Sequence, residues 1–334
     1  MGNEALLELT FDIEKKLHLE NSKNTVGNRH VFVTGLARSG STILMQTIFK
    51  SDEFSSLTYR DMPFVMAPNT WSKITGRFQD DNIRMERVHA DGIRIDYDSP
   101  EALEEVFWRV FGGKYVLKDR LVSLKLTDDA IENFRIYINL INRKYNKQRY
   151  LSKNNNNILR LPGLLRACPN AIILIPFRDP LDQAQSLLNQ HRNFIEKQQK
   201  DRFIQRYMTW LVHHEFGIDH RPFEWGIPAN PDYQPDELDY WLVQWIGVYK
   251  LLMQQISDDN EQQLFVSHEL LCEQAGIGWN NICKLLDIPF VDQLAGNYRK
   301  SHGDREKNES SDLLKEAYSI YHSLKTRSAQ RLLG

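Results

Sequence analysis

Short apolar runs alternate with segments of helical periodicity along most of this chain. The run at 171–177 is continuously apolar and the run at 30–33 is β-branched, as expected for strands of a buried parallel sheet. Residues 114–118 (Lys-Tyr-Val-Leu-Lys) predict a further strand. Helical spacing is found at 5–19, 101–111, 126–143, 240–256 and 313–324. This alternation predicts a three-layer α/β fold with a doubly wound parallel sheet of four to five strands.

Polar and proline-rich segments mark the limits of these elements. Residues 1–29 predict an N-terminal helix and a polar loop before the first strand, and Ser99-Pro100-Glu101 predicts a helix start. The segment 216–236 contains four prolines, which interrupt both helix and strand. We interpret it as a structured surface insertion, and as a candidate lid for a substrate. Residues 61–64 and 71–83 predict loop and short elements. We expect one α/β domain over residues 1–334.

Composition narrows the classes of function. A chain of 334 residues, 41% of them hydrophobic, can bury a substantial core. Its formal charge of −2, with dispersed Lys and Arg, does not indicate a nucleic-acid partner. Three widely spaced cysteines are typical of reduced thiols in a cytoplasmic protein. No apolar stretch approaches the roughly 18 residues of a membrane span, so we expect no transmembrane segment and a cytoplasmic location.

A Gly/Ser loop follows the first predicted strand. Gly35 to Thr42 fit the phosphate-loop pattern G-x-x-x-x-G-[KST]-[ST], but Ser41 stands where a Walker A lysine belongs. Backbone N–H groups of such a loop and the start of the following helix can bind an anion. The missing lysine argues against chemistry on ATP or GTP. The alternative interpretation is an ordinary turn that caps a helix.

A second polar position follows the second buried strand. The run 171–177 ends in Arg178, and Ser186 lies eight residues later on the next predicted helix. Ligands of open α/β sheets bind at the carboxyl ends of the strands. Both side chains are therefore candidates for the same anion, although a single Arg at a strand end is more often a surface or ion-pair residue.

The two segments together resemble the sulfotransferases that use 3′-phosphoadenosine 5′-phosphosulfate (PAPS). In that family a [RK]-[ST]-G-[ST]-T loop holds the 5′-phosphosulfate, and Arg38-Ser39-Gly40-Ser41-Thr42 matches it. An Arg that ends a strand and a Ser eight residues later hold the 3′-phosphate, as Arg178 and Ser186 would. The resemblance implies a soluble, bacterial-type member that moves a sulfuryl group, without a metal, from PAPS to a hydroxyl or amine.

Weaker similarities extend the resemblance to the second half of the chain. Residues 150–153 look like the family's strand that ends in lysine, which implies Lys153 near the leaving phosphate. Residues 264–271 look like its late strand–helix junction. The segment 298–304 is similar to one that covers the 3′-phosphate, which implies Arg299 and Lys300 as further donor contacts. In that segment a serine replaces a glycine and the spacing is one residue short.

The group that removes the acceptor's proton is open. In one branch of the family a histidine follows the strand-end lysine by two residues, but this chain has Asn155 there, which cannot act as a base. Another branch uses a carboxylate after the loop helix, and Asp61 is the first candidate for it. His89 with Asp91 is the second candidate and Asp119 the third. Asp61 also fits a turn-capping role.

Three functions follow from these observations. In the leading one, Arg38 contacts the bridging or sulfonate oxygens and stabilises the leaving phosphate, since sulfuryl transfer needs positioning and charge stabilisation. The alternatives are a P-loop kinase of a small molecule and a nucleotide-binding module without catalysis. The acceptor is open among carbohydrates, lipids, small metabolites and peptides, and the oligomeric state is open too.

Overall fold

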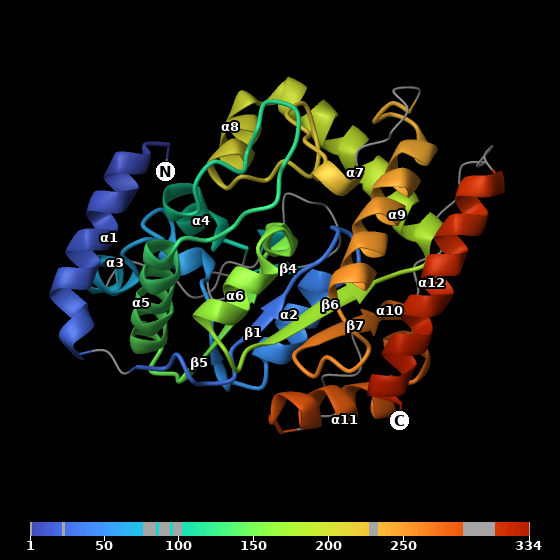
Figure 1. The fold of residues 1–334 in the computed structure, drawn as a ribbon. Coiled ribbons are helices and arrows are strands. Elements are labelled where there is room, and N and C mark those ends of the chain that lie inside the picture. Colours follow the sequence, from blue (N-terminus) through green and yellow to red (C-terminus); the bar gives the residue numbers. More distant parts are fainter. Residues whose placement is uncertain are drawn as a thin grey trace.

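A five-stranded sheet with all neighbours parallel forms the centre of the protein (Figure 1). The computed structural model describes residues 2–21, 24–75, 85–86, 94–95, 102–226, 233–289 and 311–333. The strand order is β2 (Phe54–Ser55), β5 (Arg149–Lys153), β1 (Val31–Val33), β6 (Ile172–Phe177) and β7 (Gln263–Ser267). The predicted fold class is thereby confirmed, with five strands in this sheet. A separate antiparallel pair joins β3 (Met85–Glu86) to β4 (Arg94–Ile95).

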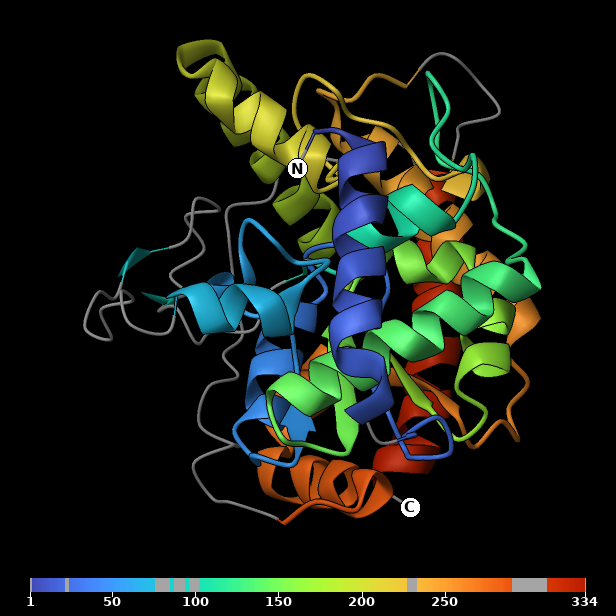
Figure 2. The same ribbon diagram turned by 90° about the vertical axis from the view of Figure 1, so that its left-hand side faces the viewer.

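Helices cover both sides of the sheet, and the first and last of them lie on opposite sides of the molecule (Figures 1 and 2). In chain order the helices are α1 (Glu4–His18), α2 (Ser41–Phe49), α3 (Pro68–Thr75), α4 (Glu105–Phe111), α5 (Asp128–Lys144), α6 (Leu161–Ala167), α7 (Pro180–Lys200), α8 (Arg202–Trp210), α9 (Leu238–Gln255), α10 (His268–Glu273), α11 (Ala275–Leu286) and α12 (Ser311–Leu332). None of these helices is both long and apolar enough to cross a membrane.

Two predicted elements differ from the structure. The strand predicted at 114–118 is wrong: Leu117 N donates to Arg120 O and Val122 N donates to Tyr115 O, so the segment turns back on itself and forms a single bridge. The helix predicted over 101–111 begins later, at Glu105. The predicted helix start, Ser99-Pro100-Glu101, lies outside the described residues. In the proline-rich insertion, the short helix η4 (Glu224–Gly226) is described, whereas 227–232 are not.

Strand residues alternate between two cores, as the pleat of a sheet requires. Val31 and Val33 of β1 belong to a core with α2 and α11, whereas Phe32 belongs to the larger core with α5, α7 and α9. The helix after β1 and the helix after β6 therefore lie on opposite faces of the sheet. A crevice forms where such connections diverge, at the carboxyl ends of two neighbouring strands. The sheet thus places the ends of β1 and β6 together.

Candidate functional site

The loop after β1 has a backbone that few residue types adopt. Gly35, Arg38 and Gly40 all have positive φ, at 140°, 66° and 90°. Gly40 is the N-cap of α2, so the first N–H groups of this helix follow directly and lack intrahelical partners. A Cβ on Gly40 would lie 2.9 Å from Cδ2 of His268. Glycine is therefore required here both by the backbone and by the close approach of the histidine.

A direct hydrogen bond joins the two motifs that the sequence singled out. Arg38 Nε donates to Ser186 Oγ at 2.9 Å, across 148 positions of the chain. Arg38 belongs to the loop after β1, and Ser186 belongs to α7, which follows β6. The predicted phosphosulfate loop and the predicted 3′-phosphate residues are thus brought to one place.

Gln183 connects the same two segments through the backbone. It is fully buried on α7, and its Nε2 donates to Ala37 O at 2.9 Å and to Leu36 O at 3.3 Å. Its Oε1 accepts from Arg178 N at 3.2 Å and from Trp245 Nε1 at 3.0 Å. Gln183 was not predicted from the sequence. Its position in the helical spacing indicates burial, but α7 buries several other polar side chains, so the sequence does not single it out.

Within the described residues, Arg178 forms no ion pair with an Asp or Glu side chain. Its Nε is buried and has no hydrogen-bond partner within the described part of the chain. The ring of His268, which contacts Gly40, is near enough to Arg178 to be affected by its charge. Burial, and secondarily Arg178, lower the pKa of His268 to about 4. A buried N–H group without a hydrogen-bond partner is costly, and a bound anion would supply the missing contact.

The end of β5 lies against the start of the loop. Asn154 N donates to Val33 O at 3.0 Å, and Thr34 Oγ1 donates to Asn155 O at 3.3 Å. Lys153, the last residue of β5, pairs in register with Val33, the last residue of β1. The predicted leaving-group lysine is therefore adjacent to the phosphate loop.

A carboxylate and a histidine lie beside this strand end. Asn155 Nδ2 donates to Glu215 Oε1 at 2.9 Å, and Glu215 Oε2 lies 3.5 Å from His213 Nδ1. Burial by itself would raise the pKa of Glu215, but His213 and Lys153 outweigh it and hold this pKa well below its usual range. Glu215 is thus an anion at neutral pH. Nothing in the sequence near residue 213 predicted this arrangement.

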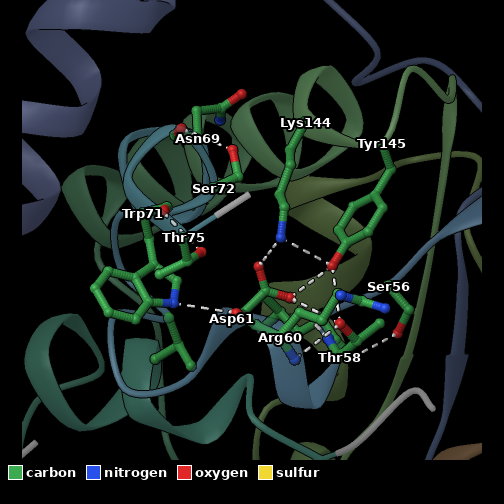
Figure 3. Close-up of polar contacts among 12 residues, drawn as sticks. Ser56, Thr58, Arg60, Asp61, Asn69, Trp71, Ser72, Thr75, Lys144 and Tyr145 are labelled. Atoms are coloured by element: carbon green, nitrogen blue, oxygen red, sulfur yellow. Dashed lines mark hydrogen bonds and ion pairs between the residues drawn. The ribbon is translucent and has the colours of Figure 1, made fainter. Parts of the chain in front are cut away.

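Asp61 lies in a buried polar cluster (Figure 3). It ends the short helix η2 (Tyr59–Asp61), and its side chain is 0% exposed. Its Oδ1 lies 2.5 Å from Lys144 Nζ, and its Oδ2 accepts from Tyr145 O–H at 2.7 Å and from Thr58 N at 2.8 Å. These contacts are those of a structural carboxylate that caps η2 and pairs with the end of α5. Within the described residues Asp61 makes no hydrogen bond to the loop, and its role as a base stays a prediction.

The other predicted site residues are placed as follows. Asp119 is 63% exposed and pairs with its neighbour Arg120 at 2.9 Å. His89, Asp91, Arg299 and Lys300 lie outside the described residues. Over the ranges that the structure describes, no group of three or more His, Cys, Asp and Glu side chains could hold a metal ion.

Comparison with known proteins places these features in context. The profile of the sulfotransferase family matches residues 30–221, more than half of the chain. No curated protein matches. Among solved structures, sulfotransferase STF1 from Mycobacterium tuberculosis H37Rv is 12% identical, with a TM-score of 0.49 over 98% of this chain and 83% of that one. STF9 from Mycobacterium avium is 14% identical, with a TM-score of 0.47 over 96% and 80%. A sulfotransferase from Alicyclobacillus acidocaldarius is 13% identical, with a TM-score of 0.40 over 91% and 95%.

Proposed function

Because the chain belongs to the sulfotransferase family, we propose that it transfers the sulfuryl group of PAPS to a hydroxyl or amine acceptor. The observation that carries the proposal is the hydrogen bond from Arg38 to Ser186. It joins the loop after β1 to the helix after β6, and each of these two neighbouring strands is followed by an arginine, Arg38 and Arg178. A nucleotide with phosphate groups at both its 3′ and 5′ positions needs two such positions.

The residues at this rim fit the donor. Gly40 is the N-cap of α2, and the first N–H groups of this helix can bind an anion. We assign Arg38 and residues 39–42 to the 5′-phosphosulfate, and Arg178 and Ser186 to the 3′-phosphate. PAPS supplies the activated sulfuryl group.

The chain's own part in the transfer is orientation and charge stabilisation. We propose that Arg38 and Lys153 stabilise the charge that develops on the departing phosphate, as cations do in phosphoryl transfer. We further propose that Arg299 and Lys300 cover the 3′-phosphate, and that no metal takes part. The acceptor is a carbohydrate, a lipid or a small metabolite.

We also propose a cytoplasmic location, because none of the three cysteines forms a disulfide. All three are free thiols, and Cys168 and Cys283 are buried. Burial raises the pKa of Cys168 to about 12, so this thiol is unreactive at neutral pH. Free, buried thiols are typical of proteins in a reducing compartment.

Calorimetric titration with adenosine 3′,5′-bisphosphate in the presence of EDTA tests the donor. The unmodified protein is expected to bind, and Arg178→Ala to bind at least about 10-fold more weakly, because hydrogen bonds to charged groups contribute about 1.5–3 kcal/mol. The matched control is Arg120→Ala, because Arg120 is 43% exposed and pairs with Asp119. It should bind as the unmodified protein does.

The same titration separates the alternatives. Magnesium-dependent binding of ATP, with none of the bisphosphate, would indicate a kinase. Tight bisphosphate binding without transfer of label from PAPS to any acceptor or to water would indicate a binding module. A panel of hydroxyl and amine compounds with labelled PAPS then identifies the class of acceptor.

A further inference from the structure

We propose that His213 takes the proton from the acceptor, and that Glu215 orients it. This inference rests on the proposed function and names the group that sulfuryl transfer requires and the sequence does not reveal. The pair lies on the segment that follows α8, far along the chain from the loop and from every base candidate predicted above.

A short chain of contacts connects the pair to the donor loop. Thr34, directly before Gly35, donates to the backbone of Asn155, and the Asn155 side chain donates to Glu215. Glu215 in turn faces His213. The pair is therefore held at the carboxyl end of β5, next to the first residue of the loop.

The position that seemed to lack a base has a role in this arrangement. Asn155 stands where a related branch has histidine, and an amide accepts no proton at neutral pH. Here its Nδ2 fixes one oxygen of Glu215 and leaves the other oxygen for His213. The base is thus supplied from another segment, and Asn155 positions it.

The contacts of His213 leave one ring nitrogen for a substrate. Its Nδ1 faces Glu215 Oε2, and no side chain in the described part of the structure hydrogen-bonds to Nε2. The side chains of His213 and Glu215 are 18% and 13% exposed, so the pair is sheltered yet open to a small group. A carboxylate at Nδ1 favours the tautomer with the proton there, which leaves Nε2 as the acceptor.

Several titratable groups surround the pair, and all bear on its pH dependence. Glu215 faces His213 within the segment, and the charge of Lys153 on β5 lowers the pKa of Glu215. His214, His220 and Arg221 follow on the same segment. Burial lowers the pKa of His214, and lowers that of His220 to about 3, so both are neutral where His213 would work.

The step balances without a further reactant. The acceptor's O–H or N–H bond breaks and its proton moves to Nε2 of His213. The acceptor's lone pair forms a bond to sulfur while the bond from sulfur to the bridging oxygen breaks. That electron pair leaves on the 5′-phosphate of adenosine 3′,5′-bisphosphate. His213 becomes an imidazolium beside the Glu215 anion and returns its proton to water.

The test measures turnover and donor binding on the same variants. His213→Asn is expected to lose about 100- to 10,000-fold in kcat, the usual contribution of a general base. Its affinity for adenosine 3′,5′-bisphosphate should stay within threefold. His213→Ala should regain part of its rate with added imidazole, which a purely structural role would not allow. Glu215→Gln should lower kcat and shift the acidic limb of the pH profile of kcat/KM.

The matched control is His322→Asn, an exposed histidine of α12, which should change none of these values. If the panel of acceptors gives no faster reaction, the rate at which label is released from PAPS to water is measured instead. A His213→Asn protein that binds the bisphosphate and turns over within threefold of normal, with an unchanged pH profile, would overturn the inference and leave the proposed function standing. An unmodified protein that does not bind the bisphosphate would overturn both.

Discussion

At the scale of single residues, the loop after β1 depends on glycine at position 40. Gly40→Ala puts a Cβ at a φ of 90° and 2.9 Å from His268. We expect the loop to shift and bisphosphate binding to weaken at least about 10-fold. The free energy of unfolding should fall by about 1–3 kcal/mol. Calorimetry and urea unfolding measure both.

Gly276 of α11 offers the matched control, because nothing lies within 4 Å of a Cβ added there. Gly276→Ala should bind the bisphosphate normally and be at least as stable as the unmodified protein, since alanine favours the helix. If Gly40→Ala behaves like Gly276→Ala, the loop is not the anion site.

The buried Asp61–Lys144 pair gives a second prediction at this scale. Asp61→Asn leaves Lys144 without its anion, and breaking a buried pair in this way costs about 3–5 kcal/mol. Asp119→Asn, at an exposed position, should change the free energy of unfolding by less than about 0.5 kcal/mol. An Asp61→Asn protein of normal stability that loses turnover and its acidic pH limb would instead make Asp61 the base.

Short motifs were enough to single out Arg38, Arg178 and Ser186 from the sequence. The structure places Arg38 against Ser186, and the roles of these residues stay predictions. The pairing of His213 with Glu215 could not be predicted, because it depends on Asn155 reaching a segment 60 positions away. A local pattern carries no information about such a contact.

At the scale of elements, α7 acts as the connection between the two halves of the site. Gln183→Leu removes hydrogen bonds to Ala37, Arg178 and Trp245 and leaves buried polar groups without partners. We expect a loss of at least about 2 kcal/mol in stability, together with weaker bisphosphate binding. Gln199→Leu, at an exposed position of the same helix, should leave both unchanged. Normal bisphosphate binding by Gln183→Leu would contradict this view of α7.

Element prediction failed where tertiary contacts override local pattern. The segment 114–118 has a short apolar run that is typical of a strand, yet it closes a turn onto 120–122. The asparagine run 154–157 looks like a solvated loop, yet it is buried because Glu104 and Glu105 accept hydrogen bonds from its side chains. Polar residues of this kind are buried when partners from elsewhere in the chain satisfy them.

At the scale of the whole molecule, buried neutral histidines make stability depend on pH. Burial lowers the pKa of five histidines: His30, His191, His214, His220 and His268. For all of these except His214, the pKa falls to about 4 or below. Unfolded histidine binds its proton near pH 6.5, so between pH 6.5 and 4 the unfolded state holds more protons. Stability is therefore fully present above pH 6.5 and is lost as the pH falls toward 4.

Urea unfolding at pH 7.5 and pH 5.0 measures this effect. We expect a loss of up to about 2 kcal/mol for each buried histidine whose pKa falls from 6.5 to 4. The variant His220→Gln should lower the dependence, whereas the exposed His322→Asn should not. Equal stability at both pH values would contradict the buried, neutral state of these histidines.

The global architecture was predictable because it follows from alternation. Buried strands and amphipathic helices in turn predict a doubly wound parallel sheet, and the structure confirms it. The length of each strand was less predictable, since β1 and β2 are only three and two residues long. Such strands are defined by their neighbours in the sheet, which no local window contains.

The separation of these residues along the chain has a consequence for biosynthesis. Arg38 emerges early from the ribosome, but its partner Ser186 and the ring of His268 against Gly40 come much later. A nascent chain that has exposed only its amino-terminal half lacks both Ser186 and His268. If the proposed donor site is correct, the loop cannot be completed until these residues have been synthesised.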